Sequence, residues 1–157
     1  MKFAAILSAA ILPIISAVSV SYDTTYDQSD ASLATVACSD GSNGLLTKGY
    51  TTFGSLPRFP YIGGVPAITG YNSPACGTCW QLTYQGTSIY VLGIDAAPGN
   101  FNIALGAMNA LTNNQAVALG RVDIDYAQVA NSNCGLPAPM KIPLETHVAA
   151  LLVLLDA

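Results

Sequence analysis

Apolar and polar residues alternate in four stretches of the chain, and this period of two is typical of half-buried β-strands. The stretches cover residues 18–26, 81–84, 88–95 and 121–129. The second and third lie on either side of Gly86, a residue that favours tight turns, so together they predict a β-hairpin. Short strands therefore dominate the predicted fold.

One stretch has a clear helical period instead. Apolar side chains recur at three- and four-residue intervals over residues 100–111, which predicts a helix with its Phe and Met in the core and Asn100 as its N-cap. Residues 114–119 predict a second short helix that ends at Gly120, since glycine is the usual residue after a helix. A single helical turn is expected over residues 32–36.

Glycine and proline interrupt the remainder of the chain. Residues 51–74 carry one or the other every few positions, which predicts an irregular surface segment without regular structure. Residues 38–46 contain an Asp-Gly pair and an Asn-Gly pair, and both pairs favour turns with positive φ angles.

The first 17 residues carry one Lys, a nearly unbroken apolar run and a small pair at the end, Ser16-Ala17. This pattern predicts a secretory signal peptide over residues 1–17, with cleavage after Ala17. The alternative is a membrane anchor, but Pro13 interrupts a run that is already shorter than the roughly 20 apolar residues needed to cross a bilayer. We therefore expect a secreted protein and no stable membrane insertion.

Charge is sparse in the rest of the chain. The whole chain has nine acidic and five basic residues, and residues 18–136 contain three basic side chains, seven Asp and no Glu. No basic stripe is present that would neutralise phosphates, so nucleic-acid binding is disfavoured and neutral partners fit better. No linker or change in composition divides these residues, so a single domain is expected.

The four cysteines are Cys38, Cys76, Cys79 and Cys134. An even number in an exported chain predicts a disulfide framework, and spacing alone leaves three pairings open. A zinc site would need further ligands, and the only His, His147, is far away in the sequence. A redox Cys-x-x-Cys pair usually begins a helix, whereas a strand-like pattern follows Cys79. We expect structural disulfides, no metal and no cofactor.

Five segments together resemble the cerato-platanin family of fungal secreted proteins. They occur in the family's order and with its cysteine spacing. They are residues 18–23 (VSVSYD), 38–45 (CSDGSNGL), 76–80 (CGTCW), 101–105 (FNIAL) and 133–136 (NCGL). The resemblance covers residues 18–136, which we take as one cerato-platanin-like domain.

The resemblance implies a mainly β fold with small helices, namely a six-stranded double-psi β-barrel like the first domain of expansins. It implies disulfides between Cys38 and Cys76 and between Cys79 and Cys134. Residues 137–157 depart from the family, whose members generally stop near Leu136. We rank a gene-model artefact first for this tail, an amphipathic extension second and a lipid-anchor signal third.

The resemblance also implies a non-catalytic protein associated with the fungal cell wall. Expected partners are chitin or N-acetylglucosamine oligomers, or cellulose and β-glucan, which the protein would loosen without hydrolysis. Elicitation of plant defence, and so a host receptor, is a further expectation. The alternative is a surface-active, self-assembling wall protein with no specific sugar site.

Sugar binding needs aromatic or apolar faces together with hydroxyl, amide or carboxylate partners. Residues 18–136 offer nine candidates, each aromatic having core packing as its alternative role. They are Asp95, Asp40, Ser42, Asn43, Tyr22, Phe53, Tyr61, Tyr71 and Asn102. Trp80, next to a cysteine on a predicted strand, is assigned to the core.

Asp95 is the candidate of most interest, because it closes a predicted strand and its position resembles the acidic residue that lines the expansin groove. Its alternative role is to cap the turn over residues 96–99. Asp123 and Asp125 share a strand face, which we interpret as a solvated surface. A serine triad needs a histidine base, and His147 lies outside the domain. We therefore expect no catalytic residue.

Overall fold

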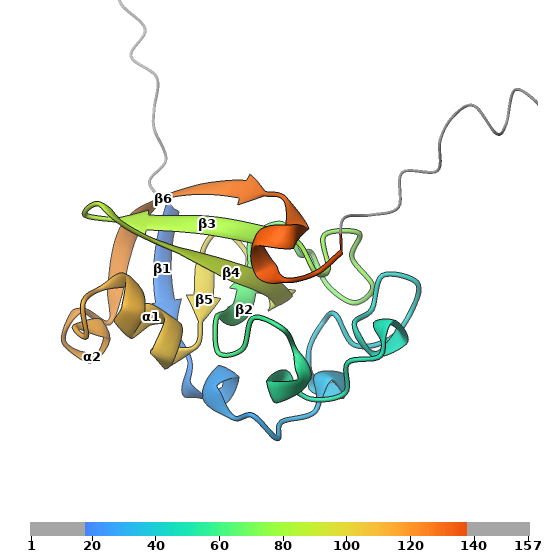
Figure 1. Cartoon of the computed structure of the whole chain (residues 1–157). Coiled ribbons are helices and arrows are strands. Elements are labelled where there is room, and N and C mark those ends of the chain that lie inside the picture. The colour runs from blue at the N-terminus through green and yellow to red at the C-terminus, as the bar shows by residue number, and fades with distance from the viewer. Residues whose placement is uncertain (1–17, 138–157) are drawn as a thin grey trace, which may run out of the picture.

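The computed structural model describes residues 18–137, and the six strands of this part of the chain close into a barrel (Figure 1). The predicted signal peptide and all but the first residue of the predicted tail lie outside the described residues. Around the barrel the strands follow the order β1, β5, β2, β4, β3, β6. Their bounds are β1 Val18–Tyr22, β2 Ile62–Val65, β3 Cys79–Tyr84, β4 Thr87–Ala96, β5 Phe101–Ile103 and β6 Arg121–Val129.

The barrel mixes strand directions. β1 pairs with β5 in parallel and β2 pairs with β4 in parallel, whereas the other neighbouring strands are antiparallel. This is the expected six-stranded double-psi β-barrel, mainly β with small helices, in a single domain. Each strand has a partner on both sides, and the long strands β4 and β6 divide their length between two partners.

Apolar side chains from alternate positions fill the barrel. Val20, Leu82 and Ile103, from β1, β3 and β5, are fully buried. Trp80 is 7% exposed, and its ring meets the Phe101 ring edge-on at 5.7 Å between centroids. The prediction that Trp80 belongs to the core is confirmed.

The hairpin and the last strand agree with the sequence pattern. β3 and β4 are joined by Gln85 and Gly86, whose φ angles are 46° and 84°. Positive φ at both positions is the signature of a type I′ turn, whose twist matches that of the strands. The opening strand is shorter than predicted, because it ends at Tyr22 and a 3₁₀ turn follows at Thr24–Asp27.

The irregular segment predicted over residues 51–74 contains a buried strand, β2, and the prediction is wrong there. A Cβ atom on Gly63 would lie 2.3 Å from the backbone oxygen of Asn102, so only glycine lets β2 approach β5 this closely. The Gly63-Gly64 pair that suggests a loop in the sequence is therefore a packing requirement of the barrel.

The predicted helix over residues 100–111 is also partly wrong. Residues Phe101–Ile103 form β5, and the helix α1 covers only Leu105–Leu111. Asn100 does not cap it. Instead, the two Asp27 carboxylate oxygens accept hydrogen bonds from the backbone N–H groups of Leu105 and Gly106, at 2.7 and 2.8 Å. A second helix, α2, covers Ala116–Leu119 and ends at Gly120, as predicted.

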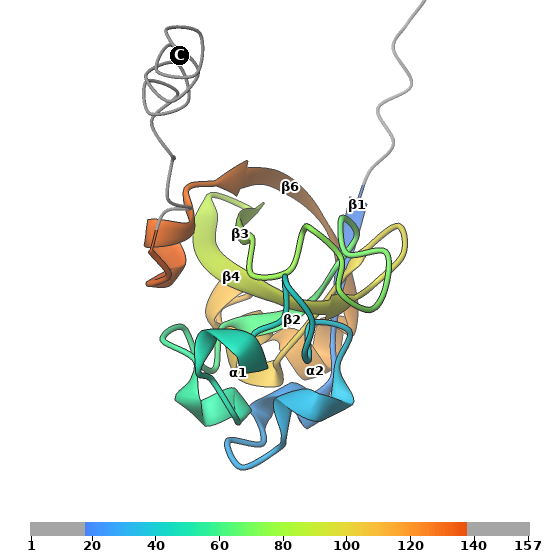
Figure 2. The ribbon, with the colours of Figure 1, turned by 90° about the vertical axis from the view of Figure 1, so that its right-hand side faces the viewer.

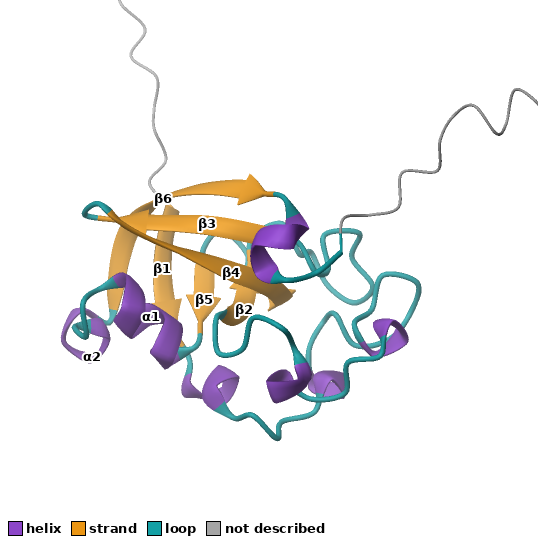
Figure 3. Ribbon diagram, viewed as in Figure 1, coloured by secondary structure: helices purple, strands orange, loops and turns teal. Residues whose placement is uncertain are grey.

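Loops and 3₁₀ turns cover one end of the barrel, as Figures 2 and 3 show. Besides η1 at Thr24–Asp27, the turns are η2 Leu33–Thr35, η3 Leu46–Lys48, η4 Phe53–Ser55 and η5 Asn131–Cys134. Two disulfides fasten these segments, and they are the implied pairs, Cys38 with Cys76 and Cys79 with Cys134. Within residues 18–137, no helix has the length and apolar character that a membrane crossing requires.

Candidate functional site

A row of register partners crosses five neighbouring strands, and we call it the outer strip. Residues opposite each other in adjacent strands share a face of the sheet, so the side chains in this row lie side by side. The outer strip consists of Arg121, Ser21, Asn102, Gly64 and Asp95, from β6, β1, β5, β2 and β4 in turn. Its side chains lie on the opposite face of β1 and β5 from the core residues Val20 and Phe101.

A β-bulge turns Asp95 onto this face. Gly63 is opposite Gly93, but the next residue, Gly64, is opposite Asp95, so Ile94 has no register partner in β2. An extra residue in one strand reverses which face the following side chains point to. Gly64 has no side chain, and a Cβ atom there would lie only 2.9 Å from the Cβ of Ala97. Gly64 is therefore buried beneath the Ala97 side chain, between Asn102 and Asp95.

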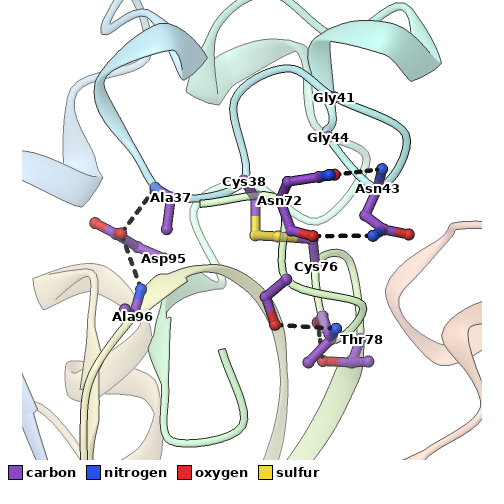
Figure 4. The surroundings of a disulfide bond; sticks show 12 residues. Ala37, Cys38, Gly41, Asn43, Gly44, Asn72, Cys76, Thr78, Asp95 and Ala96 are labelled. Atoms are coloured by element: carbon purple, nitrogen blue, oxygen red, sulfur yellow. Dashed lines mark hydrogen bonds between the residues drawn. A yellow bond between two sulfur atoms is a disulfide. The ribbon is translucent and has the colours of Figure 1, made fainter. Parts of the chain in front are cut away.

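The Asp95 carboxylate joins the barrel to the loops beside it. One oxygen accepts hydrogen bonds from the backbone N–H groups of Ala37 and Ala96, at 2.9 and 2.8 Å (Figure 4). The other accepts a hydrogen bond from the Tyr26 hydroxyl at 3.0 Å. The Ala96 contact matches the turn-capping alternative, and the other two contacts tie down residues 26–37.

The side chain of Tyr26 is buried against this carboxylate. Burial, and next the negative charge of Asp95, raise the pKa of Tyr26 above its ordinary value of 10.0. The phenol therefore stays protonated in the folded protein and remains a hydrogen-bond donor to Asp95.

Ser21, Asn102 and Arg121 form the other half of the outer strip. Each makes fewer side-chain hydrogen bonds within the protein than Asp95 does. The Ser21 hydroxyl donates to the Asn102 side-chain oxygen at 3.1 Å, and Arg121 donates to the Ser19 hydroxyl at 2.7 Å. The Asn102 NH₂ group donates no hydrogen bond to any residue that the structure describes, and Asn102 is half-buried rather than enclosed, which leaves this donor for an incoming ligand.

Four of the remaining candidates lie on two loops joined by the Cys38–Cys76 disulfide. Figure 4 shows this disulfide with Asn43 and Asn72 beside it. The backbone N–H of Asn43 donates to the side-chain oxygen of Asn72, and the Asn43 amide donates to the Asn72 carbonyl, both at 2.9 Å. On the same loops, a hydrogen bond to the Asp40 carboxylate raises the pKa of Tyr71. Ser42 is exposed between Asp40 and Asn43.

This loop pair lies next to the Asp95 end of the outer strip. The backbone N–H of Asn72 donates to the carbonyl of Ala37, the residue whose own N–H donates to Asp95. Asp40, Ser42, Asn43 and Tyr71 therefore form an edge beside the outer strip, and are not part of it.

The other aromatic candidates do not belong to the outer strip. Phe53 is fully buried, so its assignment to a sugar-binding surface is wrong, and its alternative role in the core holds. Tyr22 and Tyr61 are half-buried and pack against the core. The guanidinium of Arg58 lies 5.0 Å from the Tyr61 ring centroid, which occupies that ring with a cation–π contact.

Three members of the outer strip were not among the sequence candidates, namely Ser21, Gly64 and Arg121. Ser21 carries a usable signal, because it alternates with Val20 and Tyr22 in the opening strand. Gly64 carries none, since β2 itself is not visible in the sequence pattern. Within residues 18–137, no three His, Cys, Asp or Glu side chains are placed so as to hold a metal ion.

The closed barrel of mixed strand direction, with its two disulfides, defines a disulfide-bonded double-psi β-barrel protein. The sequence profile of the Cerato-platanin family matches residues 18–136. The chain therefore belongs to the cerato-platanin family.

Relatives and solved structures agree with this assignment. Allergen Asp f 15 of Aspergillus fumigatus is 56% identical over 117 residues, which cover 74% of this chain and 76% of the allergen. The crystal structure of cerato-platanin 3 from M. perniciosa matches with a TM-score of 0.74 and 53% identity, over 77% of this chain and all of that one. The solution structure of the fungal elicitor Cerato-Platanin matches with a TM-score of 0.68 and 46% identity, over 74% of this chain and 96% of that one.

Proposed function

We propose that the outer strip binds neutral oligosaccharides of the chitin or β-glucan type. The observation that carries this proposal is the row of hydroxyl, amide and carboxylate groups of Ser21, Asn102 and Asp95, which the register of the barrel places on one face, with Gly64 buried between Asn102 and Asp95. Sugar hydroxyls both donate and accept hydrogen bonds, and the free NH₂ of Asn102 and the remaining lone pairs of Asp95 and Ser21 complement them.

The same geometry supports a function without hydrolysis. Both oxygens of Asp95 accept hydrogen bonds from protein donors, which makes this carboxylate an anchor for the loops and a fixed acceptor for a ligand. A bound oligosaccharide would exchange contacts with neighbouring polysaccharide chains for contacts with the outer strip, and so loosen the material.

Export and host recognition complete the proposal. Two disulfides in a chain of this size suit an oxidising compartment, in line with the predicted signal peptide and with a location outside the cell or at the fungal wall. One solved relative is described as a fungal elicitor. By similarity we propose that this protein also elicits plant defence through a host receptor.

Sedimentation with insoluble polysaccharide tests sugar binding. We expect the protein to pellet with chitin or cellulose and to release no reducing sugar. Asn102→Ala should weaken binding about fivefold, the loss of one hydrogen bond. Gln128→Ala, which removes an exposed amide on β6 outside the outer strip, should bind like the wild type. Equal binding by both variants, or no pelleting of the wild type, would reject the proposal.

A second candidate function is a surface-active wall protein that self-assembles without a specific sugar site. The observation that favours it is the exposure of large apolar side chains: Val117 is 70% exposed and Tyr71 is 64% exposed. Singly exposed apolar residues are common, so this candidate needs its own test. It predicts a lower surface tension and multimers in solution, both reduced by Val117→Ser.

A further inference from the structure

A polar pocket, apart from the outer strip, lies at the end of the barrel where the β3–β4 turn meets α1. Figure 1 shows this turn at the same end of the barrel as α1 and α2. The pocket has a volume of about 370 Å³, which falls within the range of small-molecule sites, about 300 to 1,000 Å³. Six polar residues line this hairpin pocket: Tyr84, Gln85, Thr87, Thr112, Asn113 and Gln115.

The lining of the hairpin pocket is polar but carries no charged side chain. Gln85, Asn113 and Gln115 each offer both a donor and an acceptor, and Tyr84 offers a ring and a hydroxyl. A charged ligand would find no opposite charge here, and a purely apolar ligand would bury the amides without partners. A ring with several hydroxyl groups satisfies both conditions.

One backbone position at the pocket has a conformation that its residue type does not favour. Gln85 has φ 46°, whereas Asn113, at φ 52°, is of a type that tolerates positive φ. The first central position of a type I′ turn favours Asn, Asp or Gly, so Gln85 is an unfavourable choice for the turn itself. Its longer side chain nonetheless reaches the Tyr84 hydroxyl, to which its NH₂ group donates at 3.1 Å. Residues held in uncommon backbone conformations cluster at binding sites.

We propose that the hairpin pocket is a second ligand site that takes a neutral pyranose, as a mono- or disaccharide. The site is separate from the outer strip. The two sites share no residue, and on β4 the outer strip is reached at Asp95, eight residues after Thr87 of the hairpin pocket. One protein molecule therefore presents two sugar sites that do not overlap, which allows it to contact two polysaccharide chains at once.

The test is a titration of ¹⁵N-labelled protein with chitobiose, with cellobiose and with glycerol, followed by NMR. The side-chain NH₂ signals of Gln85, Asn113 and Gln115 report the hairpin pocket, and the backbone signals of Ser21 and Asn102 report the outer strip. We expect saturable shifts of the pocket signals with at least one disaccharide. The disaccharide that binds more tightly shows whether the pocket prefers the acetamido group of chitobiose or the hydroxyl group of cellobiose. Glycerol should cause no saturable shift.

Two variants separate binding from folding. Gln85→Asn suits the type I′ turn, and its shorter side chain moves the amide away from the pocket. Asn113→Gly removes the amide, and glycine adopts the positive φ freely. Both variants should therefore keep or raise the melting temperature. Each should weaken pocket binding about fivefold. Gln128→Asn, the same exchange at an exposed position of β6, should leave it unchanged.

Three results would overturn the proposal: no shift of the pocket signals with either disaccharide, wild-type affinity in both pocket variants, or equal shifts with glycerol. Shifts confined to Ser21 and Asn102 would likewise refute the hairpin pocket while supporting the outer strip. The reverse pattern would leave the pocket standing and remove the proposed function of the outer strip.

Discussion

The carboxylate of Asp27 fastens η1 to α1, and its removal should destabilise the fold measurably. The two oxygens accept hydrogen bonds from the N–H groups of Leu105 and Gly106. Hydrogen bonds to a charged group contribute about 1.5 to 3 kcal/mol each. Gly106 is exposed, so water replaces part of the loss in the variant. We therefore expect the upper end of the N-cap range, about 2 kcal/mol, for Asp27→Ala.

Urea unfolding measures this loss. With an m-value of about 2 kcal/mol/M, Asp27→Ala should lower the midpoint by about 1 M. Asp27→Asn keeps one acceptor oxygen and should lose about half as much. Asp30→Ala is the matched control, since Asp30 is exposed and accepts a hydrogen bond from the adjacent Ser29 hydroxyl. If Asp27→Ala and Asp30→Ala have the same midpoint, the capping role of Asp27 is refuted.

Two further predictions concern β2 and the alkaline limit of stability. Gly63→Ala would place a Cβ atom 2.3 Å from the Asn102 backbone oxygen and should lower the free energy of unfolding, measured in urea, by about 3 kcal/mol. Gly49 has open space around it, so Gly49→Ala should lower this free energy by only about 1 to 2 kcal/mol, because of its positive φ. Equal losses would contradict the close approach of β2 and β5. The raised pKa of Tyr26 gives stability that is fully present below pH 10 and is lost as the pH rises toward its folded-state pKa, because the unfolded phenol ionises first. The stability advantage of the wild type over Tyr26→Phe should therefore shrink above pH 10, by about 1.4 kcal/mol per pH unit, and a constant difference would show that this phenol is not perturbed.

Elements with local signals could be predicted from the sequence. The hairpin of β3 and β4 and the strand β6 are rich in β-formers, alternate over part of their length and have clear turn residues, so local propensity and tertiary context agree there. The segments that became β2 and β5 could not be predicted. Gly63-Gly64 has the composition of a loop, and residues 101–103 fit the period of the helix that follows. Both strands are stabilised by partners far away in the sequence.

Some residues of the candidate site could likewise be predicted from the sequence, and others could not. Asp95 stands out in the sequence because it closes a β-rich run, and Asn102 because it lies within a family motif. Ser21 and Arg121 join them only through the register of the barrel, and the bulge that aims Asp95 outward has no signal in the sequence. The cap of α1 is another long-range contact, since Asp27 lies 78 residues before Leu105. Sequence periodicity describes single elements, whereas the site depends on how five strands are aligned.

A titration with chitin and β-glucan hexasaccharides, followed residue by residue by NMR, tests whether the outer strip is the sugar-binding face. We predict that the backbone amide signals of Ser21, Asn102 and Asp95 shift together along one saturation curve, and that the Asn102→Ala variant binds the sugar more weakly. Unchanged signals of these three residues at saturating sugar, or identical shifts in the wild type and in Asn102→Ala, would show that the outer strip does not bind sugar.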